Sequence, residues 1–145
     1  MYKHLLIATD GSELASKALS QGLGLAEALD ARATVLMVSE PWTAFVSGEA
    51  AIAFPIEEYD RAVTAKVRDV LTAAATAAKA QGVTCETVHA KDQYPAEGII
   101  AAATRYGCDL IVMASHGRRG LTRLFLGSQT NNVVTQSTIP VLVCR

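Results

Sequence analysis

The stretch that decides the fold is DLIVMASHGRRGLTRLFLGSQT, residues 109–130. Its first part is a short apolar run rich in branched side chains, which predicts a strand buried on both faces. A polar loop with glycines and arginines follows, and the stretch closes on Gly127-Ser128, directly before a predicted helix. Small residues let the backbone approach an anion closely, and the amides and dipole of a helix N-terminus favour negative charge. The stretch therefore predicts a strand, a loop and a helix start that together form an anion site.

The rest of the chain alternates strand and helix patterns, which predicts an α/β fold with a mainly parallel, five-stranded sheet and helices on both faces. The predicted strands are residues 3–9, 33–39, 83–90, 109–114 and 139–144, and the predicted helices are residues 13–29, 56–80, 95–107 and 128–136. No internal repeat or linker divides the 145 residues. We therefore expect one doubly wound, Rossmann-like domain over residues 1–145, with strand order 3-2-1-4-5.

The two strand ends that should meet in such a sheet both carry polar residues. Ligands of doubly wound folds bind off the carboxyl ends of the strands, at the point where the strand order reverses. Here these ends are Thr9-Asp10, after the first strand, and Ala114-Ser115, after the fourth. The chain order and the polar residues thus predict the same cleft.

Asp10 fits two roles at this point. Its carboxylate could lie near sugar hydroxyls or a bound metal ion, or it could cap the first helix. Asp10 and Glu13 have the acidic form of the capping-box spacing, and Ser12 is a second candidate cap. One residue can serve both roles, so the two readings stay open.

The small residues and the helix start of the deciding stretch predict a set that faces phosphate and ribose, namely Ala114, Gly117, Gly127 and Ser128. Gly117 and Gly127 are either turn glycines or positions where the backbone approaches a phosphate. Ser128 is either the N-cap of the last helix or a donor to phosphate oxygens through its hydroxyl and amide. The backbone amides of Gln129 and Thr130 extend this nest.

The loop between them carries one histidine and three arginines. His116 has no carboxylate or cysteine at ligand spacing, which argues against zinc and leaves a solvated loop residue or a contact with ribose or phosphate. Arg118 is the best candidate among the arginines for a phosphate contact, and Arg119 and Arg123 are weaker ones. A solvated loop face is the alternative reading of these three charges.

The spacing of this set carries a family resemblance. Ala114, two residues, Gly117, nine residues and Gly127-Ser128 resemble the nucleotide-binding signature of the universal stress protein family, which has Gly at the first position. The opening HLLIATDGSELASKAL, residues 4–19, and the closing STIPVLVCR, residues 137–145, resemble the first and last strands of that family. The resemblance covers nearly the whole chain. Ala114 is the departure within the motif, and its Cβ disfavours positive φ.

The resemblance implies an ATP-binding regulatory protein of the stress response, with Mg²⁺ held mainly by the phosphates and water. It implies that Thr9 and Asp10 contribute to the nucleotide site and that the backbone at Val38 meets the adenine edge. By its pattern alone Val38 is a core residue. The last strand is apolar, and an exposed edge of that kind invites pairing with another chain. We therefore expect a homodimer through residues 139–144, as in the resembled family.

Composition narrows the function classes. The formal charge of −1 gives no electrostatic reason to expect nucleic-acid binding. No apolar run approaches the length of a membrane span, and the N-terminus lacks the pattern of a secretory signal. Three dispersed cysteines without a CxxC motif are typical of reduced, mostly buried thiols. These features predict a cytoplasmic protein without membrane insertion.

Three functions stay open at this point. The sequence lacks the P-loop, GxSxG and HExxH motifs and an obvious base to activate a nucleophile, which favours nucleotide binding over turnover. A dimeric interaction protein with a degenerate site is the alternative that Ala114 supports, and a slow ATPase is the weakest. Residues 40–55 are predicted to be irregular, and loops of this length are often lids or binding loops for a ligand or an unidentified protein partner.

Overall fold

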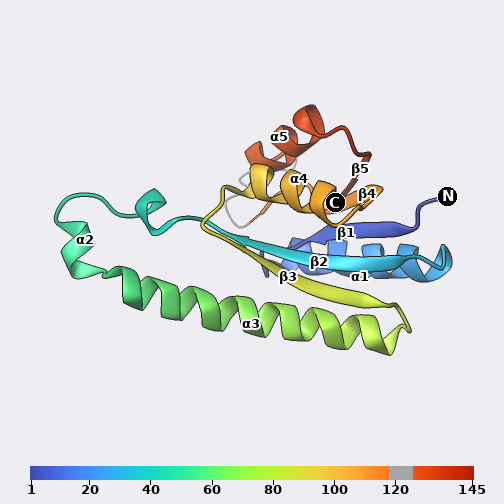
Figure 1. The fold of residues 1–145 in the computed structure, drawn as a ribbon, viewed down its shortest axis with the longest axis horizontal. Coiled ribbons are helices and arrows are strands. Elements are labelled where there is room, and N and C mark those ends of the chain that lie inside the picture. Colours follow the sequence, from blue (N-terminus) through green and yellow to red (C-terminus); the bar gives the residue numbers. More distant parts are fainter. Residues whose placement is uncertain (118–125) are drawn as a thin grey trace.

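The computed structural model describes residues 1–117 and 126–145. Within these residues, one sheet is built from β1 (His4–Ala8), β2 (Arg32–Ser39), β3 (Cys85–Lys91), β4 (Leu110–Ala114) and β5 (Val141–Cys144). All neighbouring strands pair in parallel, in the order β3-β2-β1-β4-β5 (Figure 1). The predicted fold class and strand order are confirmed.

Helices cover both faces of this sheet. The first face packs against α1 (Glu13–Ala28) and α3 (Ile56–Ala80), and the second against α4 (Pro95–Arg105) and α5 (Ser128–Gln136). Side chains of β1 alternate between the two cores, with Leu5 and Ile7 on the first face and Leu6 on the second. β1 and β4 are therefore buried along their whole length, as expected for central strands. In the part of the chain that the structure describes, no helix is long and apolar enough to cross a membrane.

The last strand begins at Val141 and not at residue 139 as predicted. The predicted start of β3 and the predicted end of α4 are also wrong, both because of the way a helix ends. Gly82 follows α3 with φ of +70°, and the Val83 amide donates to the Ala78 carbonyl at 3.0 Å. Val83 therefore completes the end of the helix, and β3 begins only at Cys85. In the same way Gly107, with φ of +66°, follows an α4 that already ends at Arg105.

The segment 40–55 is more regular than predicted. It contains a short 3₁₀ helix, η1 (Trp42–Ala44), and a single helical turn, α2 (Ala50–Ala53). In Figure 1 this segment extends outward from the end of β2 and returns into the N-terminus of α3. It therefore forms an arm beyond the strand ends rather than a loop folded onto them.

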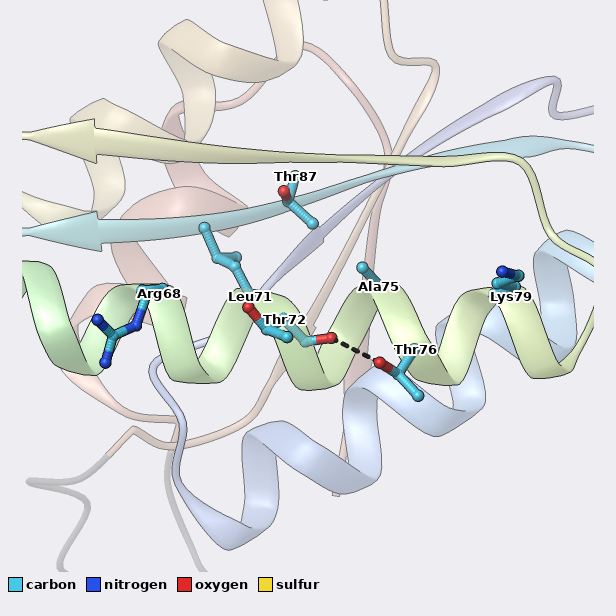
Figure 2. A pocket seen from close by; sticks show the side chains of 7 residues that line it. All are labelled: Arg68, Leu71, Thr72, Ala75, Thr76, Lys79 and Thr87. Carbon is cyan, nitrogen blue, oxygen red and sulfur yellow. Dashed lines mark hydrogen bonds between the residues drawn. The ribbon is translucent and has the colours of Figure 1, made fainter.

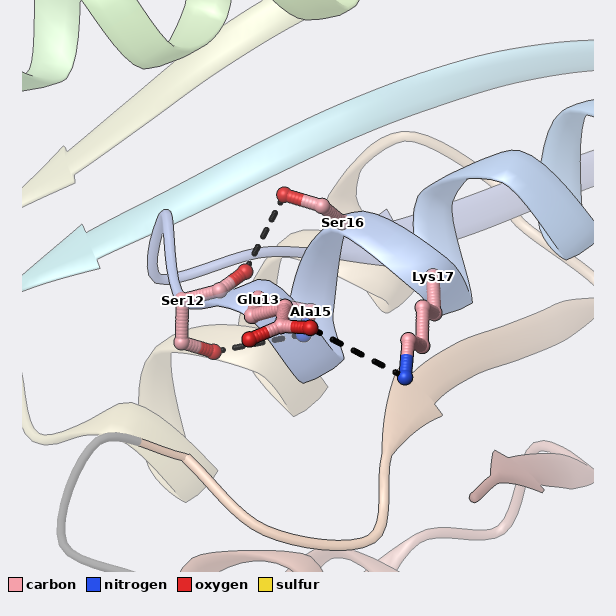
Figure 3. Close-up of polar contacts among 5 residues, drawn as sticks. All are labelled: Ser12, Glu13, Ala15, Ser16 and Lys17. Atoms are coloured by element: carbon pink, nitrogen blue, oxygen red, sulfur yellow. Dashed lines mark hydrogen bonds and ion pairs between the residues drawn. The ribbon is translucent and has the colours of Figure 1, made fainter.

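The first helix is capped by Ser12 and not by Asp10 (Figure 3). Ser12 has extended backbone angles, and its hydroxyl accepts from the Ala15 amide at 3.2 Å. Ser16 donates to the Ser12 carbonyl at 3.0 Å, and the exposed pair Glu13–Lys17 lies at 4.0 Å. The predicted capping box of Asp10 and Glu13 is therefore wrong, because the chain makes one more turn before the helix begins.

A buried polar chain lies at the opposite end of the sheet from these strand ends. His4 Nε2 lies 2.7 Å from Thr34 Oγ1, which donates to Glu86 Oε1 at 3.0 Å. Since the threonine proton goes to Glu86, the Thr34 oxygen accepts from His4 and fixes the proton on Nε2. The other ring nitrogen, Nδ1, is buried without a hydrogen-bond partner within residues 1–117 and 126–145. A second proton on His4 would therefore place a positive charge in a buried position.

This arrangement predicts an acid-sensitive stability. Burial first, and Arg32 second, lower the pKa of His4, while Glu86 and Asp109 oppose that shift. The folded state then binds fewer protons than the unfolded state below pH 6.5, so the free energy of unfolding falls as pH drops from 6.5 towards the lowered pKa. We expect the His4→Gln variant to lose less stability than the wild type between pH 7.5 and pH 5, measured by urea unfolding at each pH.

His89 also makes the free energy of unfolding fall as the pH drops, because burial and Lys91 lower its pKa as well. The double variant His4→Gln/His89→Gln should therefore have a flatter pH profile than either single variant. A His4→Gln protein with the full wild-type slope would contradict the role assigned to His4.

Candidate functional site

The carboxyl ends of β1 and β4 meet, as the strand order requires. The two strands pair in parallel from Leu5 opposite Leu110 to Ile7 opposite Val112, so their ends lie side by side. Asp10 follows β1 and Gly117 follows β4, and a Cβ atom on Gly117 would lie only 2.8 Å from Asp10 Oδ2. The predicted meeting of the two strand ends is confirmed. Gly117 is small because the Asp10 carboxylate lies against it.

Asp10 and Thr9 shape the turn that leads from β1 into α1. Asp10 Oδ1 accepts from the Ser12 amide at 2.9 Å, and Thr9 Oγ1 accepts from the Gly11 amide at 3.2 Å. Thr9 is buried and Asp10 half-buried. Asp10 therefore orients the chain before the cap, and the reading of Asp10 as the helix cap is wrong. Its second oxygen faces the loop after β4.

The start of α5 lies directly against the end of β4. The Gly127 amide donates to the Ser115 carbonyl at 2.8 Å. A Cβ on Gly127 would lie 3.2 Å from that carbonyl oxygen and 3.4 Å from the Cα of His116, so a side chain there would meet backbone. With φ of −58°, Gly127 is needed for this close approach and not for a left-handed turn. Gly127 is also the N-cap, so the reading of Ser128 as the cap is wrong, and Ser128 is the exposed first residue of the helix.

Two side chains of the first turn hold α5 in place. The Thr130 hydroxyl, which is buried, donates to the Ala114 carbonyl at 2.9 Å. The Gln129 side chain accepts from the Ala96 amide of α4 at 3.3 Å. The amides of the first helical turn have no acceptor within their own helix, because the residues four positions earlier precede it. The result is a fixed group of amide donors beside the ends of β1 and β4.

His116 and Ser115 pair with each other beside Gly127. Ser115 Oγ lies 3.0 Å from His116 Nδ1, and Ser115 is buried while His116 is half-buried. Within the described residues, no group of three or more His, Cys, Asp or Glu side chains could hold a metal ion. The contact with Ser115 engages His116 Nδ1, so Nε2 is the ring nitrogen that Ser115 does not engage.

Val38 belongs to the core through its side chain. It lies in β2 and packs into the core of the α4 and α5 face, where a Cβ on Gly98 would lie 3.0 Å from Val38 Cγ2. The core reading of its side chain is confirmed, although Val38 is only partly buried. Arg118, together with Arg119 and Arg123, lies outside the described residues.

Two contributions were not foreseen in the sequence. Ser115 connects three parts of the molecule, because its carbonyl accepts from Gly127, its amide donates to the Cys144 carbonyl of β5 at 2.8 Å, and its hydroxyl pairs with His116. The Gln129 bridge to α4 joins positions 33 residues apart. Only the place of Ser115 directly after a strand could have indicated its role, whereas no sequence pattern indicates the glutamine bridge.

A separate groove lies between α3 and the edge strand β3 (Figure 2). It has a volume of about 460 Å³, and its lining residues are Arg68, Leu71, Thr72, Ala75, Thr76, Lys79 and Thr87. Thr76 Oγ1 donates to the Thr72 carbonyl at 3.0 Å along its helical wall. None of the predicted site residues lines this groove, so it is distinct from the meeting point of β1 and β4.

Comparisons with known proteins agree with this fold. The sequence matches the universal stress protein family over residues 1–145. It is 32% identical over 149 residues to Universal stress protein YxiE of Bacillus subtilis, covering 100% of both chains. The fold matches the structure of protein MJ0577 with a TM-score of 0.80 at 27% identity, covering 99% of this chain and 96% of that one. It also matches a universal stress protein in complex with cAMP, with a TM-score of 0.74 at 26% identity, covering 99% and 97% of the two chains.

We expect the hydrogen bond from Thr130 to Ala114 to contribute to stability by holding α5 against β4. Thr130→Val keeps the shape of the side chain but leaves the Ala114 carbonyl without its donor, which should lower the free energy of unfolding by about 1–3 kcal/mol. Thr130→Ser keeps the donor and is the matched control. Urea unfolding of both variants measures the difference, and equal stabilities would mean that the bond does not hold the helix.

Proposed function

This chain belongs to the universal stress protein family, and we propose that it binds ATP where β1 and β4 end, as a regulatory protein of the stress response. The observation that carries the proposal is the close approach of Gly127 to the backbone of Ser115 and His116. That contact leaves the first-turn amides of α5 beside the end of β4, where a phosphate group can accept from them.

Each part of the nucleotide has a partner in this proposal. The phosphates lie on the amides of Ser128, Gln129 and Thr130, and the Ser128 hydroxyl is exposed at the same helix start. The sugar lies near Asp10, whose Oδ2 borders Gly117. The adenine edge meets the backbone at Val38. His116 contributes a ring nitrogen and Arg118 a positive charge to the phosphate end.

Mg²⁺ fits this site only as a companion of the phosphates. Among the described residues no cluster of ligating side chains could hold the ion by itself, and the Asp10 carboxylate borders Gly117 after β4. Magnesium usually keeps several waters and binds through one or two carboxylates plus phosphate oxygens. The residues present therefore suit an ion that arrives with the nucleotide.

The similarity to a relative in complex with cAMP supports an adenine nucleotide as the ligand.

Nucleotide binding is tested by mass spectrometry of small molecules released from the denatured protein, followed by calorimetric titration with Mg²⁺ and ATP. We expect Gly127→Val to weaken ATP binding at least tenfold, about 1.4 kcal/mol, because its side chain must displace the start of α5. Gly24→Val is the control, since nothing lies within 4 Å of a Cβ at that position. Its ATP affinity should equal that of the wild type.

Absence of bound nucleotide together with absence of heat at millimolar ATP would contradict the proposal. Ala114 would then mark a site that has lost its ligand, and the chain would be a dimeric interaction protein. A Gly24→Val protein that loses affinity as strongly as Gly127→Val would mean that the loss reflects a general change in the fold.

We further propose that the chain forms a homodimer through β5. This strand is at the edge of the sheet, and Leu142 on it is 40% exposed. An apolar edge strand presents unpaired backbone groups to a second copy. Leu142→Lys should weaken dimerisation at least tenfold, because a charge would enter the interface. Sedimentation equilibrium measures this, with Val134→Lys on α5 as the control, and a wild-type monomer at tens of micromolar concentration would contradict the dimer.

A further inference from the structure

The arm between β2 and α3, taken together with the first five residues of α3 (residues 40–60 in all), has a composition unlike the rest of the chain. It contains five of the 14 acidic residues and none of the 13 lysines and arginines. It also contains four of the eight aromatic residues, which are Trp42, Phe45, Phe54 and Tyr59. The remainder of the chain therefore has 13 basic and nine acidic residues, so the two parts have opposite net charge.

Large apolar side chains are exposed on this arm. Phe45 is 46% exposed, Ile52 83%, Phe54 38% and Ile56 46%. We call these four residues the arm patch. Single exposed apolar residues need no explanation, but four large ones within twelve positions concentrate exposed apolar surface, and such surface usually marks a binding site.

The arm patch rests on an ordered framework. The rings of Phe45 and Phe54 both lie against Tyr59, with centroids 5.8 and 6.1 Å away. The Tyr59 hydroxyl donates to the Glu40 carbonyl, and Trp42 Nε1 donates to the Phe54 carbonyl at 2.9 Å. A surface held in this way loses little conformational freedom when a partner docks.

Acidic side chains accompany the arm patch. Glu49, Glu57 and Glu58 are exposed, and each lies within three positions of Ile52 or Ile56 in the sequence. Asp60 is paired, because Lys91 of β3 lies 3.4 Å from its carboxylate. Glu57 and Glu58 also complement the dipole of α3, since they occupy its first turn. That role explains neither Glu49 nor the exposure of the four apolar side chains.

We propose that the arm patch docks a cationic amphipathic segment of another protein. The apolar face of such a segment covers the arm patch, and its lysines and arginines meet the glutamates around it. Arginine and lysine also interact favourably with the faces of exposed aromatic rings. An anionic membrane surface does not fit, because the acidic side chains would be repelled. The arm extends from the end of β2, whereas β5 forms the edge of the sheet that lies three strands away. Docking on the arm therefore does not compete with the proposed dimer.

The test uses the nucleotide-free full chain and a synthetic helical peptide of leucine and lysine, about 18 residues or five turns long. Trp42 is the only tryptophan, so its fluorescence reports binding at the arm. We expect a dissociation constant of about 10 μM, and at least tenfold weaker binding of a leucine–glutamate peptide and of a lysine–serine peptide. These two peptides test the charge and the apolar face separately.

Ile52→Gln and Glu49→Lys should each weaken binding of the leucine–lysine peptide, Ile52→Gln by about tenfold. Both positions are exposed, so the fold should persist, and circular dichroism checks this. The matched control is Val134→Gln, which changes a 41% exposed residue on α5 and should leave binding unchanged.

Several outcomes would overturn the inference. One is no binding at 1 mM peptide, and another is equal binding of the leucine–lysine peptide and either comparison peptide. A third is equal loss in Ile52→Gln and Val134→Gln. A fourth is self-association of the unliganded chain that Ile52→Gln abolishes, since a second copy would then cover the arm patch. None of these measurements involves ATP, so their failure leaves the nucleotide proposal standing.

Discussion

The parallel pairing of β1 with β4 is the interaction on which the rest of the structure depends. These two strands lie at the centre of the sheet and have both faces buried, so their register is fixed by the packing of two cores at once. The register places Asp10 against Gly117. Farther along the chain, Gly127 lies against the carboxyl end of β4, because its amide donates to the Ser115 carbonyl. A shift of one residue would invert every side chain of the strand and separate all of these contacts.

Much of this arrangement could be predicted from the sequence, because it follows from periodicity and chain order. Alternating strands and helices, together with right-handed crossovers, lead to the order β3-β2-β1-β4-β5 and to the meeting of Asp10 with the loop after β4. Element ends were less predictable. Asp10 and Ser12 both have a side chain suited to capping, and only the backbone angles of the turn decide that Ser12 caps α1.

Contacts between distant segments could not be predicted. Gln129 is an ordinary polar residue in the sequence, yet its side chain joins α5 to α4. Thr130 was expected to contribute only its amide, but its hydroxyl holds the helix against β4. Both interactions depend on where two elements pack in space, and no local pattern in the chain encodes that. The sequence predicts residues 40–55 only as a long irregular loop, and the short helices and exposed apolar side chains of this segment are evident only in the fold.

The hydrogen bond from the Ser115 amide to the Cys144 carbonyl has a thermodynamic consequence. Ser115 also accepts from Gly127, so a single residue, through the peptide groups on its two sides, connects the start of α5 with the edge strand β5. A ligand that moves this residue would change the free energy of whatever the edge strand binds. Linkage is reciprocal, so assembly at the edge would change the affinity for that ligand by the same factor. Ligand occupancy at the end of β4 and assembly through β5 would then be thermodynamically coupled, so a measurement of one would report on the other.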